Sequence, residues 1–163
     1  MYKQTLTYED FNGDTVTESH HFNLSKREIK DLFIETPNFV DDFLSAFDTK
    51  PVIDKKTNKP VIDPETGEVV VELVDRREAA KAIDYIVDLS YGVKTEDGKR
   101  FIKSKELLDT FKTTGFYDEL MIQLIIDQEL ATNFFNGIFP KEIQEKAKTL
   151  TKEEIDKVLE EHR

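Results

Sequence analysis

Histidine is the side chain best suited to proton transfer and metal binding near neutral pH, and this chain contains three of them. His20 and His21 are adjacent in a segment with the alternation of a β-strand, so they should point to opposite faces of that strand. The two rings therefore cannot bind one metal ion from that strand without distorting it. We expect both to have a structural or surface role, and His162 belongs to no pattern that indicates chemistry.

Acidic side chains are numerous, but their spacing matches no cation-binding or phosphate-binding motif. Asp10, Asn12 and Asp14 alternate as the ligands of a calcium loop do. The twelfth position of such a loop would be His21, where a calcium loop places glutamate. Residues 96–99 are too polar and too poor in glycine to cradle a phosphate, and cysteine is absent. The sequence therefore predicts no catalytic residue, no cofactor and no metal site, and a protein that is not an enzyme.

The overall charge limits the partners that the chain can have. Its 34 Asp and Glu residues outnumber its 23 Lys and Arg residues, which gives a net charge of -11. Nucleic acids and anionic membranes are bound by clusters of Lys and Arg, so we expect the chain to bind neither. No apolar stretch approaches the ~20 residues of a transmembrane helix, and the first residues lack the apolar run of a signal peptide. A cytoplasmic protein that binds other proteins is the expected class.

The elements that position these side chains begin with an antiparallel β-hairpin over residues 2–23. Apolar residues alternate on both sides of a turn that contains Asn12-Gly13. A two-residue loop would divide the apolar residues between the two faces, whereas a three-residue loop over 11–13 keeps them on one face. Gly13 then adopts the left-handed conformation, which a residue without Cβ reaches without a clash. The predicted cross-strand pairs are Tyr8–Val16 and Tyr2–Phe22.

Residues 50–74 differ in character from the segments on either side. The sequence Lys-Pro-Val-Ile-Asp at 50–54 recurs at 59–63, and each copy leads into a segment with Asn or Gly before a charged residue. Asn and Gly tolerate the left-handed backbone that tight turns require. We predict two successive hairpin turns and a three-stranded β-meander, with the proline-bearing strands at edges. A flexible loop is the alternative interpretation.

Helical periodicity dominates the rest of the chain. The predicted fold is α+β and mostly α: the N-terminal antiparallel β-hairpin packs on about six short helices, and the β-meander is inserted as an arm. Residues 75–139 form the helical core, residues 1–140 one domain, and residues 141–163 a charged helical tail. The residues expected to cap helix N-termini are Ser25 with Glu28, Asn38, Asp75 with Glu78, Ser104 and Asp127. The glycines interpreted as helix ends are Gly92, Gly115 and Gly137.

Apolar residues in the last two core helices provide the candidate site. In the first of them the residues at core spacing are Leu120, Met121, Leu124 and Ile125. In the second the candidate protein-interaction residues are Phe134, Phe135, Ile138 and Phe139. A short helix buries only part of such a set. Core packing is one interpretation, and the other is that Ile138 and Phe139, beyond Gly137, belong to an apolar surface that contacts a partner.

Four segments resemble one known family. They are residues 5–13, the stretch SYGVKTEDGKRFIKS at 90–104, the stretch FKTTGFYDEL at 111–120, and FFNGIFP at 134–140. Together they resemble the tail assembly chaperones of siphophages, which occur in phages and prophages of Gram-positive hosts. The resemblance covers the hairpin and residues from about 75 to 140. The arm at 50–74 departs from the family pattern, and the C-terminal tail is not diagnostic.

The resemblance implies a non-enzymatic role in viral tail assembly in the cytoplasm of the bacterial host. Such a chaperone binds the tape measure protein, keeps it soluble, helps recruit the major tail tube protein and is not expected in the mature virion. It has no catalytic residues to carry over. The negative charge of this chain suits a solubilising role, and its Phe-rich helices suit apolar contact. A homo-oligomer is plausible because many copies must coat a long partner.

Two other functions are consistent with parts of the sequence. A structural tail completion or connector protein would use the hairpin and the arm for strand pairing between subunits. An acidic inhibitor that mimics nucleic acid would use the negative charge alone.

Overall fold

The computed structural model describes residues 1–139, so Pro140 and the predicted helical tail at 141–163 lie outside the described residues. Contacts divide the chain into two compact units. The first, called the sheet unit, contains Met1–Asp31 and the chain from Ile86 onward, and the second, called the arm unit, is Leu32–Tyr85. Residues 1–139 form six helices and six strands, which confirms the predicted α+β fold.

The elements in chain order are β1 (Tyr2–Glu9), β2 (Thr15–Phe22), α1 (Lys26–Glu35), α2 (Phe39–Ser45), β3 (Thr49–Pro51), β4 (Val71–Leu73), α3 (Arg76–Ser90), β5 (Tyr91–Lys94), β6 (Phe101–Ile102), α4 (Lys105–Phe111), α5 (Gly115–Ile126) and α6 (Gln128–Ile138). The boundaries between the two units fall inside α1 and α3, so both helices carry the chain from one unit to the other.

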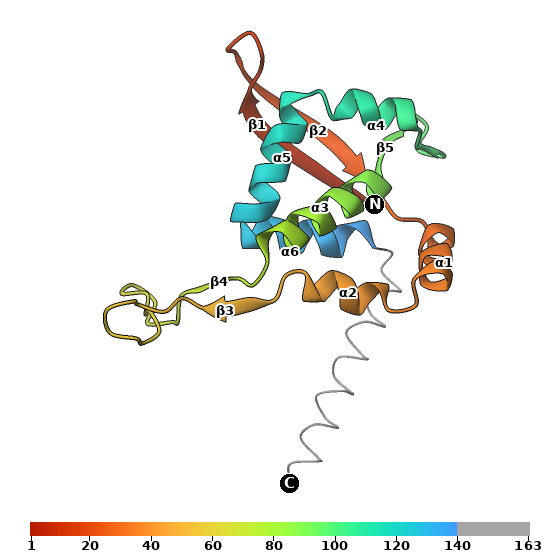
Figure 1. Ribbon diagram of the computed structural model, residues 1–163. Coiled ribbons are helices and arrows are strands. Elements are labelled where there is room, and N and C mark those ends of the chain that lie inside the picture. The colour runs from red at the N-terminus through yellow and green to blue at the C-terminus, as the bar shows by residue number, and fades with distance from the viewer. Residues whose placement is uncertain (140–163) are drawn as a thin grey trace. The chain divides into compact units, whose positions relative to one another are not determined.

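The N-terminal hairpin has the predicted register. Tyr8 lies opposite Val16 on β1 and β2, and Tyr2 lies opposite Phe22. The amide of Asp10 donates a 2.9 Å hydrogen bond to the carbonyl of Asp14, which closes the three-residue loop. Gly13 has a φ of 83°, as the predicted turn requires. The even-numbered face of β1 is the covered one, and α5 lies along it (Figure 1).

Two strands that the sequence did not reveal extend the hairpin into a four-stranded sheet of order β1-β2-β5-β6. Strand β5 pairs antiparallel with β2 through His21↔Gly92, and β6 pairs antiparallel with β5. The predicted polar turn lies between β5 and β6, where the amide of Thr95 donates to the carbonyl of Arg100 at 3.0 Å. Strands of four and two residues are too short to show a clear alternation, so pattern alone could not separate them from the turn.

The prediction that Gly92 ends a helix was wrong. Helix α3 ends at Ser90, and the chain enters β5 directly, with Gly92 buried inside the strand. A Cβ atom at this position would lie 2.5 Å from Cε1 of Phe101. Gly92 is therefore required by the close approach of a side chain on β6 and not by helix termination.

Gly115 and Gly137 were also wrongly interpreted as helix ends. Gly115 is the first residue of α5, and Gly137 lies inside α6, which continues to Ile138. A Cβ atom on Gly115 would lie 2.8 Å from Cε2 of Tyr8, and one on Gly137 would overlap the ring of Tyr2. Both glycines therefore let tyrosines of β1 press against helix backbone.

Side chains cap the helices of the sheet unit largely as predicted. Ser25 and Glu28 form the predicted capping box. The Ser25 amide donates to the Glu28 carboxylate at 2.8 Å, and the Glu28 amide donates to the Ser25 hydroxyl oxygen at 3.2 Å. Ser104 accepts from the amide of Leu107, and Asp127 accepts from that of Leu130. Helix α5 begins at a cap that was not predicted. There, Thr114 accepts from the amide of Tyr117 at 3.2 Å.

Aromatic rings dominate the core of the sheet unit. The ring of Phe22 lies 4.9 Å from that of Phe134 and 6.0 Å from that of Phe111, measured between centroids. Tyr91 stacks on Phe111 with centroids 3.9 Å apart and an interplanar angle of 7°. The other buried apolar residues of this unit are Leu6, Leu24, Ile29, Ile86, Val87, Phe116, Leu120, Leu124 and Ile138.

Helix α2 of the arm unit packs through aromatic residues. Phe39 and Phe43 stack with ring centroids 5.8 Å apart, and the ring of Tyr85 lies 5.9 Å from Phe39. Leu44 on the same helix is largely exposed. Asn38 occupies the predicted N-cap position, but its side chain forms no capping hydrogen bond.

The arm contains the successive pairings of the predicted meander, and its first and third segments also pair with each other. Strands β3 and β4 pair antiparallel at its base, and isolated bridges follow toward the tip. The amide of Val52 donates to the carbonyl of Val70, and the amide of Val70 donates to the carbonyl of Val61. The amide of Val61 donates in turn to the carbonyl of Val52, and each of the three distances is 2.9 Å. A flat meander would keep its first and third strands apart. Here three segments form a closed ring of hydrogen bonds, at the end of the arm labelled β3 and β4 in Figure 1.

The two predicted turns of the arm are confirmed, and they share one geometry. The carboxylate of Asp54 accepts from the amide of Lys56, and that of Asp63 accepts from the amide of Glu65, both at 2.7 Å. The residues with positive φ are Asn58 in the first turn and Gly67 in the second.

Candidate partner-binding surface

Helix α5 has apolar residues on two opposite sides. One side carries Phe116, Leu120 and Leu124, which are buried in the sheet unit. The other side carries Ile122, Ile125 and Ile126, whose exposed fractions are 54%, 52% and 68%. These three residues are spaced by three and four positions, so they are neighbours on one surface of the helix. We call them the isoleucine face.

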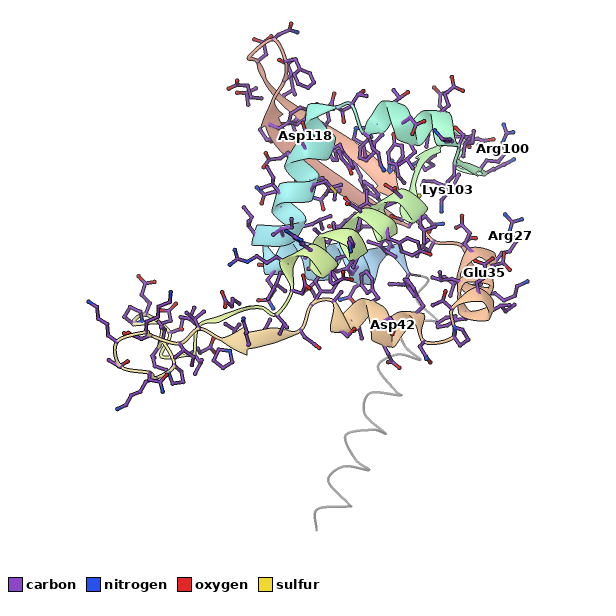
Figure 2. All side chains as sticks on the ribbon, viewed as in Figure 1. Arg27, Glu35, Asp42, Arg100, Lys103 and Asp118 are labelled. Atoms are coloured by element: carbon purple, nitrogen blue, oxygen red, sulfur yellow. The ribbon has the colours of Figure 1, made fainter. Side chains whose placement is uncertain are left out.

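A helix that is apolar on all sides is normally buried on all sides, because water disfavours exposed hydrocarbon. In residues 1–139 the isoleucine face remains exposed. Asp118, labelled in Figure 2, is also exposed and lies one helical turn before Ile122. The face is therefore an apolar surface with an acidic residue at its N-terminal border.

Both ends of α5 are fixed in the sheet unit. At the N-terminal end, Tyr8 lies against Gly115 and edge-on to the ring of Phe116, with centroids 6.1 Å apart. At the C-terminal end, the amide of Asp127 donates to the carbonyl of Gln123 while its carboxylate caps α6. One residue therefore ends α5 and begins α6, which makes a sharp connection. The isoleucine face is presented by a helix that is held at each end.

The structure divides the four residues predicted as the interaction site. Phe134 and Ile138 are fully buried, whereas Phe135 and Phe139 are half-buried. The ring of Phe134 lies 5.5 Å from that of Tyr2, and the carbonyl of Ile138 accepts from the amide of Leu24 at 3.0 Å. Phe134 and Ile138 are therefore core residues in this structure. A role of the cluster in partner binding stays a prediction.

Sequence reasoning missed the isoleucine face and wrongly assigned Ile125 to the core. The reason is the composition of α5, in which both sides are apolar, so periodicity cannot show which side turns inward. The number of apolar residues in this helix was a signal that could have revealed the exposed side. Eight apolar residues from Phe116 to Ile126 exceed what one side of a helix can bury.

Lys103, labelled in Figure 2, is the centre of a polar cluster that links segments of the sheet unit far apart in the sequence. Its Nζ lies 2.8 Å from both carboxylate oxygens of Glu28, and it also donates to the carbonyls of Asn23 and Leu89. Burial of the Glu28 carboxyl acts to raise its pKa, but the hydrogen bonds from Lys103 and from the Ser25 amide outweigh burial, so the pKa lies below its ordinary value. The cluster therefore connects the start of α1, the end of α3 and the segment after β6.

The two adjacent histidines have separate surroundings, as predicted. The ring of His20 packs against Phe116 and Phe111, with centroids 4.4 Å and 5.0 Å away. Burial lowers the pKa of His20, although Glu18 opposes this effect. Burial and the charges of Lys94 and Lys3 lower the pKa of His21. His20 thus serves as a packing residue beneath the sheet.

Within residues 1–139, no three or more His, Cys, Asp or Glu side chains gather in a way that could hold a metal ion. None of the helices in the same range combines the length and apolar content needed to cross a bilayer.

Comparison with known proteins adds a family assignment. A family model described as phage tail assembly chaperone matches residues 1–162. The match runs through the arm at 50–74 as well as the hairpin and the helices. No curated protein and no solved structure gives a significant match. Since the family model covers nearly the whole chain, this protein belongs to the phage tail assembly chaperone family.

Proposed function

We propose that this chaperone binds the tape measure protein of a siphophage, keeps it soluble in the host cytoplasm and helps recruit the major tail tube protein. It does so without catalysis and leaves before the virion is complete. Family membership supports the general role. The observation that carries the specific one is the exposed isoleucine face on a helix fixed at both ends.

The chemistry of the partner fits that face. A tape measure protein is long and helical, and it exposes apolar helix surfaces until the tail tube encloses it. An amphipathic helix docks on an apolar surface through residues three and four positions apart. Ile122, Ile125 and Ile126 are each about half exposed, so covering them contributes about 1 kcal/mol each. A total of about 3 kcal/mol corresponds to a more than hundredfold gain in affinity.

The C-terminal end of α6 supplies a second proposed contact. Phe135 and Phe139 remain half-buried, while Phe134 and Ile138 anchor the same helix from inside the core. In this proposal the exposed parts of Phe135 and Phe139 contact the partner. The buried side chains of Phe134 and Ile138 hold the helix in position. The net charge of -11 keeps the complex with an apolar partner in solution.

The test is co-expression of the tagged chain with overlapping fragments of the tape measure protein encoded by the same phage. We expect specific fragments to be retained on the tagged chain and to stay soluble. The triple change Ile122→Ser, Ile125→Ser and Ile126→Ser should reduce retention at least tenfold. Retention of no fragment by the unchanged chain would contradict the proposed function.

A matched control separates the isoleucine face from exposed apolar surface in general. Val93 and Ile102 form an exposed cross-strand pair on β5 and β6 of the same unit. The double change Val93→Ser and Ile102→Ser should leave retention unchanged, and circular dichroism should show that both variants remain folded. Equal loss in both variants would contradict a specific role for α5. Abundant peptides of this chain in purified virions would instead favour the structural tail protein.

A further inference from the structure

The arm carries opposite charges on its two turns. The first turn, residues 54–59, presents Lys55, Lys56 and Lys59, and we call it the basic turn. The second turn, residues 63–68, presents Glu65 and Glu68, and we call it the acidic turn. All five side chains are exposed, and in the described part of the chain none of them takes part in an ion pair.

The backbones of the two turns have the same hydrogen-bonding pattern. Each begins with an Asp whose carboxylate accepts from the amide two residues later at 2.7 Å. In each, the amide of that Asp donates to the carbonyl of the last residue of the turn, at 2.9 Å for Asp54 and 2.8 Å for Asp63. Lys56 therefore occupies the position of Glu65. Lys59 likewise occupies the position of Glu68, so two matching positions carry opposite charges in the two turns.

Apolar side chains flank the charged turns. Ile53 precedes the basic turn, Ile62 precedes the acidic turn, and Val69 and Val71 follow it. All four are roughly 43–53% exposed. Val71 lies in the β3–β4 ladder, and the other three lie in the isolated bridges of the arm, so pairing within the arm positions these exposed side chains. An apolar surface bordered by both signs of charge is complementary to a second copy of itself.

We propose that the arm is a self-association device whose partner is the arm of a second copy of this chain. The basic turn of each copy lies against the acidic turn of the other. In a two-fold symmetric dimer every contact occurs twice, so the basic turn of the first copy meets the acidic turn of the second, and the basic turn of the second meets the acidic turn of the first. The apolar residues are covered between the turns. A chain of net charge -11 repels other copies, so association needs a local surface where positive groups meet negative ones.

The experiment is a charge swap in the full chain, read by sedimentation equilibrium over a range of concentrations. One variant carries Lys56→Glu and Lys59→Glu, and the other carries Glu65→Lys and Glu68→Lys. Each variant alone should dissociate about tenfold or more readily than the unchanged chain, because like charges then face each other. An equimolar mixture should regain association, since the two variants are complementary.

A matched control tests whether overall charge explains the result. Lys99→Glu with Arg100→Glu makes the same change in net charge as the variant with Lys56→Glu and Lys59→Glu, but on the exposed turn between β5 and β6. This variant should associate like the unchanged chain. Thermal melting should show that all variants fold, since Asp54 and Asp63 are retained. A monomeric unchanged chain, an equal effect of the control, or a mixture that stays dissociated would each overturn the proposal.

Discussion

The sheet unit and the arm are stabilised in opposite ways. In the sheet unit, aromatic side chains are buried, and tyrosines of β1 press against glycines in helices α5 and α6. In the arm, backbone hydrogen bonds and Asp-capped turns hold three short segments together while the apolar side chains stay exposed. Substitutions of side chains should therefore destabilise the sheet unit and leave the arm folded. The difference shows that the arm has side chains available for contact with partners.

The largest expected effect comes from removing a ring from the core. Phe134→Ala should lower the free energy of unfolding by about 3–5 kcal/mol, because a fully buried ring leaves a cavity. Phe135→Ala, one residue away and half-buried, should lower it by less than about half as much. Urea denaturation of both variants measures the difference, and equal losses would contradict the burial described for α6.

The next effect tests the contact between a tyrosine and a helix glycine. Gly137→Ala should cost about 1–3 kcal/mol because the added methyl group overlaps the ring of Tyr2, even though alanine favours helix. In a Tyr2→Ala background the same change should cost much less. A double-mutant cycle from urea denaturation measures this coupling. An unchanged cost in both backgrounds would mean that Gly137 acts through backbone conformation instead.

A smaller effect should follow from removing the charged group at the centre of the Lys103 cluster. Lys103→Met should cost about 1–3 kcal/mol at neutral pH, because Glu28 and two carbonyls lose a charged donor. Since the folded pKa of Glu28 lies below its ordinary value of 4.5, the stabilisation is complete above that value. It is lost as the pH falls through the lowered pKa. The difference in stability between the two chains, measured by urea denaturation at several pH values, should therefore narrow in acid to the part that the two carbonyls contribute, and a constant difference would contradict the pairing with Glu28.

The smallest effect concerns the arm. Asp63→Ala removes the carboxylate that accepts from the amides of Glu65 and Thr66, at a local cost of about 1 kcal/mol. Hydrogen exchange should accelerate for these amides, whereas the urea midpoint of the sheet unit should stay unchanged. A shift of that midpoint comparable to the Phe134→Ala shift would contradict the contrast between the two regions.

Local features of the structure could be predicted from the sequence. The hairpin register followed from Gly13 and the alternation on each side, and the arm turns followed from the recurring Asp and the Asn or Gly near each turn end. The caps at Ser25, Ser104 and Asp127 followed from hydrogen-bonding side chains at helix starts. In each case the residues that decide the structure lie within a few positions of one another.

Features decided by distant residues could not be predicted. Gly115 and Gly137 are explained by rings of Tyr8 and Tyr2, which are more than a hundred positions away in the chain. The exposed side of α5 is decided by which side meets β1 and α6, so Ile125 could not be told from Leu124. Which residues remain exposed depends on packing, so the sequence did not reveal the isoleucine face, and partner binding by the residues singled out on α6 stays a prediction.

The ring formed by Val52, Val61 and Val70 limits how this part of the gene can vary. The three valines recur every nine residues, and each donates one amide and accepts one, so the circle is complete with three members. Deleting one nine-residue segment would replace the circle by a simple pair in which the two remaining valines exchange both bonds, and duplicating one would require the circle to open. Changes in length should therefore be tolerated as gain or loss of the whole arm, not as gradual lengthening.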